Sequence, residues 1–160
     1  MNTASSKEFS SGKVKEIYGE ILSILGLGGE EIKEILDQTE EDPEYEDSPA
    51  FALLDILIEG ELCADLDWKF GADDVEYNLN LLAKRLKMAP IREYPPYEEG
   101  QPLGYEALEM IMSECEHAAI AIFDGDTIYV FLTDKEKAPM LKAQMDKLEE
   151  FWVLRDAFIV

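Results

Sequence analysis

The chain has few basic residues: 36 aspartates and glutamates stand against 14 lysines and arginines, which gives a formal net charge of −22. Binding to a phosphate backbone depends on clustered Lys and Arg, so we expect no nucleic-acid partner. Attraction to an anionic membrane surface depends on the same residues, so we expect no membrane partner either. A charge of this size keeps a protein soluble, and it also steers a basic protein partner toward the surface.

Long apolar runs, cysteines and histidines are scarce as well. The runs FALLDILI and AAIAIF are far shorter than the ~20 residues that span a bilayer, and MNTASSKEFSSGKVKE at the start has no apolar signal region. We therefore expect a cytoplasmic protein with a disordered lead-in over residues 1–12. Cys63, Cys115 and the single histidine, His117, lack the paired spacings of a zinc site, and we expect both thiols to be reduced.

Sequence motifs of common catalytic sites are also missing. The chain has no P-loop, Rossmann glycine fingerprint or nucleophile elbow, and GLGG at 26–29 precedes a Glu-rich helix that would repel a phosphate. Cys115 and His117 are two residues apart, a spacing that separates side chains on a helix, and His117 is placed to cap that helix. DGDT at 124–127 lacks the distal Glu of a calcium loop. We therefore expect a protein that is not an enzyme.

Apolar periodicity predicts one α+β domain over residues 13–160. Two β-rich runs meet at Asp124-Gly125, a dipeptide typical of hairpin turns, and both faces of this 118–133 hairpin are apolar, so we expect it to be covered on both sides. The fold class is therefore a small, mainly antiparallel sheet packed by several amphipathic helices. The first helices are expected over 13–25, after GLGG, from Ser48-Pro49 to Gly60, and from a capping box at Asp73 and Glu76. Two more are expected, one with Leu108 and Cys115 on its inner face and one from Pro139. Further strands are expected in ELCADLDW, at Ile91–Tyr94 and in the C-terminal AFIV.

The most negative part of the chain is residues 30–47, where ten acids are opposed only by Lys33. We interpret TEEDPEYED, residues 39–47, as a solvated loop. Tyrosines beside carboxylates and prolines, here and in REYPPYEEG, favour contact with Arg-rich partners, although they can also pack on their own domain. We therefore hypothesise an immunity- or inhibitor-like protein that binds a basic protein partner through the acidic surface around residues 30–47, with residues 93–99 as a further contact. The predicted contact residues are Glu40, Glu41, Asp42, Glu44, Tyr45, Glu46, Asp47, Tyr94 and Tyr97.

Asp65 and Asp67 support an alternative hypothesis. The period-two pattern of ELCADLDW places both carboxylates on one face of a strand, where they can bind a divalent cation or share a proton. The alternative function is therefore a divalent-metal-dependent enzyme or metal-binding domain that uses Asp65 and Asp67, with Asp124 or Asp126 from a neighbouring strand. A solvent-exposed strand face is the competing interpretation. We expect no cofactor apart from a weakly bound divalent cation.

The LDWK element at residues 66–69, followed by an amphipathic helix in a small acidic chain, resembles uncharacterised bacterial families known only as domains of unknown function. In size and charge the whole chain is similar to small immunity proteins of bacterial toxin systems, which are often acidic and bind basic toxin domains. That second resemblance implies a basic partner and assigns no residues. Mimicry of nucleic-acid charge is a special case of the same hypothesis.

Overall fold

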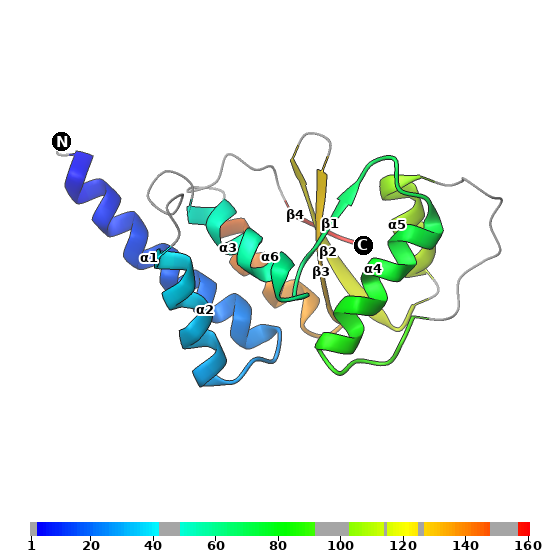
Figure 1. The fold of residues 1–160 in the computed structure, drawn as a ribbon, viewed down its shortest axis with the longest axis horizontal. Coiled ribbons are helices and arrows are strands. Elements are labelled where there is room, and N and C mark those ends of the chain that lie inside the picture. The colour runs from blue at the N-terminus through cyan, green and yellow to red at the C-terminus, as the bar shows by residue number, and fades with distance from the viewer. Residues whose placement is uncertain (1–2, 42–48, 92–102, 114, 125–126, 148–156) are drawn as a thin grey trace.

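A four-stranded antiparallel sheet with six helices around it forms the part of the chain that the computed structural model describes (Figure 1). The described residues are 3–41, 49–91, 103–113, 115–124, 127–147 and 157–160. The elements in chain order are α1 (Thr3–Ile24), α2 (Gly29–Glu41), α3 (Pro49–Glu59), β1 (Ala64–Asp67), α4 (Ala72–Arg85), α5 (Gly104–Ser113), β2 (His117–Asp124), β3 (Thr127–Asp134), α6 (Ala138–Lys147) and β4 (Ala157–Ile159). The predicted single α+β domain is confirmed.

The predicted hairpin lies in the centre of the sheet. The strand order is β1-β3-β2-β4, so β1 and β4 are the two edges. β2 and β3 pair from His117 opposite Asp134 to Asp124 opposite Thr127. The two-residue connection itself lies outside the described residues. The C-terminal strand expected from AFIV is confirmed as β4, which pairs with β2.

Each face of the hairpin is buried under its own layer of helices. Successive side chains of a strand point to opposite faces, so Ile120 and Phe131 pack with α1, α2, α3 and α6. Ala121 and Val130 pack with α4 and α5 on the other face. Figure 1 shows the two layers on either side of the strands. The expectation that both faces are covered is therefore confirmed, and it explains the continuous apolar run in this part of the sequence.

The end of α1 agrees with the sequence prediction, but its beginning differs. Gly26 has a φ of 94°, the left-handed conformation that glycine supplies after a helix. The N–H of Leu27 donates to the carbonyl of Leu22 at 3.2 Å and closes the helix end. The backbone is helical from Thr3, and the disordered lead-in expected over residues 1–12 stays a prediction. A helix that has nucleated over its buried stripe extends at little cost where no proline interrupts it.

The end of α2 corrects the loop that we predicted from residue 39 onward. Thr39 is buried, and its hydroxyl donates to the carbonyl of Ile35 at 2.7 Å. The first proline after the start of α2 is Pro43, so no residue before it breaks the helix. As a consequence, Glu40 and Glu41 belong to a helix and not to a loop.

The start of α4 also differs from the prediction. The helix begins at Ala72 with Gly71 as its N-cap, and no side chain caps it. Gly71 is extended, with a ψ of 175°, because it forms an isolated bridge with Leu103. Asp73 therefore lies inside the first turn, where its charge is stabilised by the helix dipole instead of by a capping box.

Two further local predictions fail within the described residues. His117 does not cap a helix: it is the first residue of β2, because pairing with β3 continues to this position. Ile91 belongs to no strand, and the rest of the segment expected as an edge strand, residues 92–94, lies outside the described residues. In the part of the chain described here, no helix combines the length and the apolar character that crossing a membrane requires.

Candidate functional site

β1 carries both predicted metal carboxylates on its exposed side. Ala64 and Leu66 are buried against α4 and α5, whereas Asp65 and Asp67 are exposed. Within the part of the chain that the structure describes, β1 is an edge strand, since it pairs there only with β3. Charged side chains on an edge strand discourage pairing with another chain, so the fold gives this alternation a structural explanation.

Asp67 also closes the turn that follows β1. Its Oδ1 accepts a hydrogen bond from the backbone N–H of Lys69 at 2.8 Å, and its carbonyl accepts one from Phe70 at 3.0 Å. The N–H of Gly104 donates to the carbonyl of Phe70 at 2.7 Å. Gly104 has a φ of 54°, and a Cβ at this position would lie 2.6 Å from the carbonyl oxygen of Trp68. The carboxylate of Asp67 is therefore an integral part of a tightly packed turn.

The described residues supply no third ligand for Asp65 and Asp67. Nowhere among them do three or more His, Cys, Asp or Glu side chains form a group that could hold a metal ion. Asp124 lies opposite Thr127, which lies opposite Asp67, so its backbone is two strands, or about 10 Å, from that of Asp67. Asp126 lies outside the described residues. Metal binding by Asp65 and Asp67 stays a prediction.

The two cysteines and the histidine have structural surroundings. Cys63 and Cys115 are free and buried. Burial raises the pKa of the Cys63 thiol well above its ordinary value, and the charge of Asp65 raises it further. A nucleophilic cysteine needs the thiolate form, which this environment disfavours. The backbone N–H of His117 donates to Sγ of Cys115 at 3.4 Å, and its ring Nε2 lies 2.8 Å from the carbonyl oxygen of Ala89.

The predicted partner-binding residues are only partly described. Glu40 and Glu41 lie in the last turn of α2, and both are exposed. The other predicted contact residues lie outside the described residues: Asp42, Glu44, Tyr45, Glu46, Asp47, Tyr94 and Tyr97. The part of the predicted surface that the structure describes therefore lies on the outer, exposed side of α2.

Four acids line this outer side of α2 in a single row. Glu30, Glu34, Asp37 and Glu41 recur at i, i+4, i+7 and i+11, and all four are exposed. Because an α-helix has 3.6 residues per turn and rises 1.5 Å per residue, this spacing places them on one face over about 16 Å. The buried side of the helix lies opposite. We call these four residues the acidic stripe.

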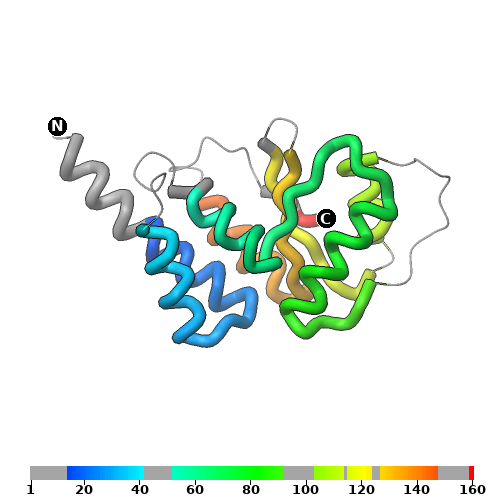
Figure 2. The backbone as a smooth tube through the Cα atoms, in the orientation of Figure 1, coloured from blue at the N-terminus to red at the C-terminus, as the bar shows by residue number. Residues whose placement is uncertain are grey.

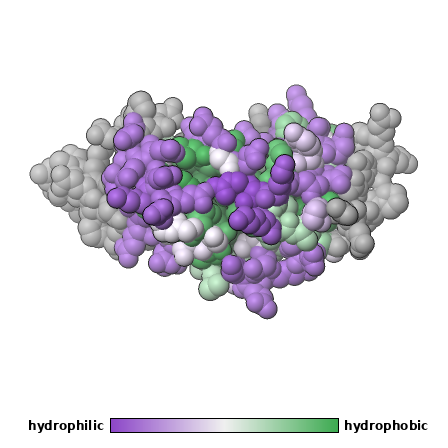
Figure 3. All heavy atoms as spheres, turned by 60° about the horizontal axis from the view of Figure 1, so that its bottom comes forward, coloured by the Kyte–Doolittle hydropathy of each residue, from purple (hydrophilic) through white to green (hydrophobic). Residues whose placement is uncertain are grey.

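Cations flank the acidic stripe without neutralising it. Glu31 pairs with Arg85 on one side of the helix, and Glu40 pairs with Lys15 on the other. Among the residues that the structure describes, no ion pair includes a residue of the stripe. The last turn of α2 contains no basic residue, although a helix C-terminus favours positive charge. Figure 3 shows hydrophilic side chains gathered over the α1–α2 end of the molecule.

A known protein family matches most of the chain. A family model described as a domain of unknown function (DUF6630) matches residues 18–150. The chain belongs to this family. The DUF6630 region contains the acidic stripe, β1 with its two aspartates and the whole central hairpin, and it ends before β4. No curated protein and no solved structure matches the chain.

The sequence prediction omitted most of the acidic stripe from its contact residues. It placed the binding surface around residues 30–47, but the contact residues that it named began at Glu40. Glu30, Glu34 and Asp37 lie within that surface but were not named as contact residues. The signal that identifies them is their helical spacing, which shows that they share one face with Glu41.

Proposed function

We propose that this DUF6630 protein is a non-enzymatic binding protein that engages a basic protein partner through the acidic stripe. The observation that carries the proposal is the row of four exposed acids on α2, none of which forms an ion pair within the described residues. The sequence directly after α2, from Asp42 to Asp47, contains four more acids. An immunity- or inhibitor-like role suits such a surface, because the partner then supplies the missing positive charges.

The arrangement of the stripe supports a partner because it is unfavourable for the isolated helix. Glu30–Glu34, Glu34–Asp37 and Asp37–Glu41 are like-charge pairs at i, i+4 or i, i+3. Each such pair destabilises a helix by roughly 0.2–0.5 kcal/mol. Lysines and arginines on a partner would remove this repulsion, and the long-range field of the −22 chain would accelerate their approach.

The geometry also constrains the partner. The stripe is straight and about 16 Å long, so the complementary surface needs several Lys or Arg side chains over a similar length. Arginine suits this role because its guanidinium binds a carboxylate with two parallel hydrogen bonds. We place the protein in the cytoplasm as part of the same proposal, and its two free cysteines support a reducing compartment.

Capture from a lysate of the source cells tests the proposal. The tagged full chain is incubated with lysate, washed, and eluted in steps of rising salt, and the released proteins are identified by mass spectrometry. We expect a stoichiometric basic protein that elutes at moderate salt, since salt screens exposed charges. An empty eluate, or a captured protein without a basic surface, would contradict the proposal.

A matched pair of variants assigns the binding to the stripe. The stripe variant is Glu34→Gln/Asp37→Asn/Glu41→Gln, which keeps Glu30 because an acid in the first turn stabilises the helix. The control variant is Glu59→Gln/Glu109→Gln/Glu136→Gln, which neutralises three exposed acids outside α2. Only the stripe variant should lose the partner. Equal loss in both variants would mean that net charge, and not the stripe, is responsible.

A further inference from the structure

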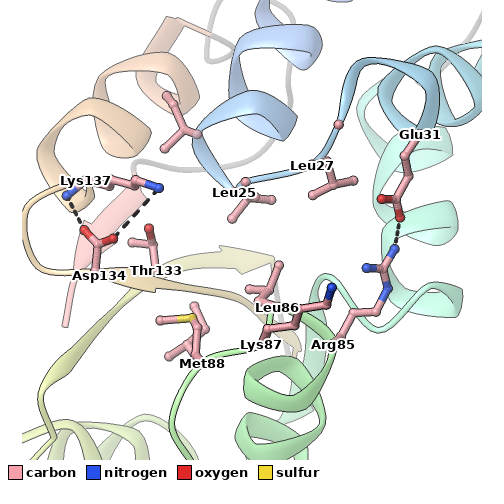
Figure 4. Close-up of a pocket in the computed structure, with 14 residues that line it drawn as sticks. Leu25, Leu27, Glu31, Arg85, Leu86, Lys87, Met88, Thr133, Asp134 and Lys137 are labelled. Carbon is pink, nitrogen blue, oxygen red and sulfur yellow. Dashed lines mark hydrogen bonds and ion pairs between the residues drawn. The ribbon is translucent and has the colours of Figure 1, made fainter.

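A pocket of about 430 Å³ lies where the two helical layers meet at one end of the sheet (Figure 4). Its walls come from the end of α1 and the chain after it (24–28), from Glu31 of α2, from the end of α4 and the chain after it (85–88), from the end of β3 (132–134) and from Lys137. Figure 2 shows the ends of α1 and α4 approaching each other on the lower side of the molecule. Sites for small molecules have volumes of about 300–1,000 Å³, so the pocket has the size of a ligand site.

The charges around the pocket form pairs, with one exception. Glu31 pairs with Arg85. Oδ1 of Asp134 accepts a hydrogen bond from the backbone N–H of Lys137 at 2.9 Å, and Nζ of Lys137 lies 3.9 Å from the other carboxylate oxygen. Lys87 forms no ion pair within the described residues, although the chain has 36 acids for 14 basic residues. The uncompensated charge of the pocket is therefore positive.

The backbone holds Lys87 in a conformation that favours glycine. Lys87 directly follows the C-cap of α4 and has a φ of 59°. The N–H of Met88 donates to the carbonyl of Ala83 at 2.8 Å, the bond that closes this type of helix end. Across the pocket α1 ends in the same way, but there the left-handed residue is Gly26. The lysine therefore brings an ammonium group to the pocket at a position where its side chain costs conformational free energy.

Apolar side chains line part of the pocket, beside a larger polar surface. Leu25 and Leu27 come from the chain after α1, and Leu86 and Met88 face them from the end of α4 (Figure 4). Walls of this kind bind the hydrocarbon or aromatic body of a ligand, while a few polar groups fix its orientation. Figure 3, which brings the lower side of Figure 1 forward, shows apolar side chains between the hydrophilic ones on this face.

We propose that the pocket binds a small organic monocarboxylate, with the carboxylate on the ammonium of Lys87 and the apolar body between the leucines and Met88. A single negative charge matches the single uncompensated cation. Glu31 and Asp134 also line the pocket, and the chain carries a net charge of −22, so polyanions such as nucleotides are repelled. This site is separate from the acidic stripe and does not depend on the proposed partner.

Paired probes test the proposal by NMR. The ¹⁵N-labelled full chain is titrated with hexanoate and with phenylacetate, and in parallel with the neutral amides hexanamide and phenylacetamide. We expect a carboxylate to cause saturable shifts in the backbone amides of residues 24–28, 86–88 and 133–137. Its matched amide should bind about ten-fold more weakly, because it lacks the charge-assisted bond to Lys87. Equal affinity for acid and amide, or no saturable shift with any probe, would overturn the proposal.

Lys87→Gly separates binding from folding. Glycine suits the left-handed position, so this variant should melt no lower than the wild type while it loses about ten-fold in carboxylate affinity. Lys33→Gln, which removes an exposed lysine of α2 that does not line the pocket, is the control and should bind as the wild type does. Unchanged carboxylate affinity in Lys87→Gly would overturn the assignment of the carboxylate to this ammonium.

Discussion

Exposed acids form two regular patterns in this protein, one on α2 and one on β1, and their surroundings differ. The two acids of β1, Asp65 and Asp67, alternate with buried residues on an edge strand, and Asp67 accepts a backbone hydrogen bond from the following turn. The four acids of the stripe share one face of a helix and have no cationic partner among the described residues. Protection of an edge and closure of a turn explain the first pattern. No contact within the described fold explains the second.

The difference teaches how to separate structural charge from charge that is available for binding. On β1 the carboxylates stabilise the fold or prevent wrong pairing, so removal of Asp67 should lower stability. On α2 the carboxylates repel one another, so their removal should raise stability. If removal of the carboxylates changes the free energy of unfolding with opposite signs in the two regions, the comparison is sharpened. Changes of the same sign would contradict it.

The largest effect is expected for Gly104→Ala, which tests whether the turn after β1 is rigidly packed. The new Cβ would lie 2.6 Å from the carbonyl oxygen of Trp68, at a φ of 54°. Overpacking and a left-handed alanine together should lower the free energy of unfolding by about 2–4 kcal/mol in urea denaturation. Gly19→Ala is the control: it lies within α1 with open space around it, and should stabilise by about 0.5–1 kcal/mol. A loss below about 1 kcal/mol in Gly104→Ala would disprove the tight packing.

The next effect concerns Asp67 itself. Asp67→Ala removes the acceptor for the N–H of Lys69, so urea denaturation should show a loss of about 1 kcal/mol. Asp67→Asn keeps a side-chain oxygen at the same position and should recover most of that loss. If both variants are equally destabilised, the negative charge matters more than the hydrogen bond, and the structural account of β1 needs revision.

A smaller effect of opposite sign is expected for the stripe variant, Glu34→Gln/Asp37→Asn/Glu41→Gln. Relief of three like-charge pairs should raise the free energy of unfolding by about 0.5–1 kcal/mol. The gain should shrink in about 1 M salt, where exposed charges are screened. The control variant, Glu59→Gln/Glu109→Gln/Glu136→Gln, corrects for the general benefit of a lower net charge. A stripe variant that is less stable than this control would show that the stripe has a structural role.

The smallest effect is expected for divalent cations. Millimolar Ca²⁺ or Mg²⁺ should raise the melting temperature of this acidic chain modestly, since any cation that prefers the folded state stabilises it. Asp65→Asn/Asp67→Asn should show the same rise as the wild type within error. A rise that disappears in the double variant would establish the metal-binding alternative and would assign these two aspartates a function.

Local signals in the sequence predicted the elements that depend on local physics. The 118–133 hairpin followed from two β-rich runs and one turn dipeptide, and Gly26 marked the end of α1 because its left-handed conformation is a property of glycine. α2 was predicted too short because Thr39 is a polar residue that becomes buried only through packing against neighbouring elements. The Thr39 hydroxyl then donates a hydrogen bond to the carbonyl of Ile35 within the helix. This bond is not evident from the sequence alone.

The sites were harder to predict than the elements. The pocket gathers Leu27, Lys87 and Thr133 from segments that are far apart in the sequence, so no local pattern indicates it. The close approach of Gly104 to Trp68 is a similar long-range contact. The acidic stripe, in contrast, was present in the helical spacing of α2, and it became visible only when the charges were placed on the helix and the intramolecular ion pairs were known.

The most direct test of the central claim is the rate at which the captured partner associates with the wild type, the stripe variant and the control variant at increasing ionic strength. Steering by the stripe predicts a wild-type association rate that falls steeply with salt, and a stripe variant that associates about ten-fold more slowly at low salt with a much weaker salt dependence. The control variant should behave almost like the wild type. Identical rates and salt dependence in the wild type and the stripe variant would contradict the account.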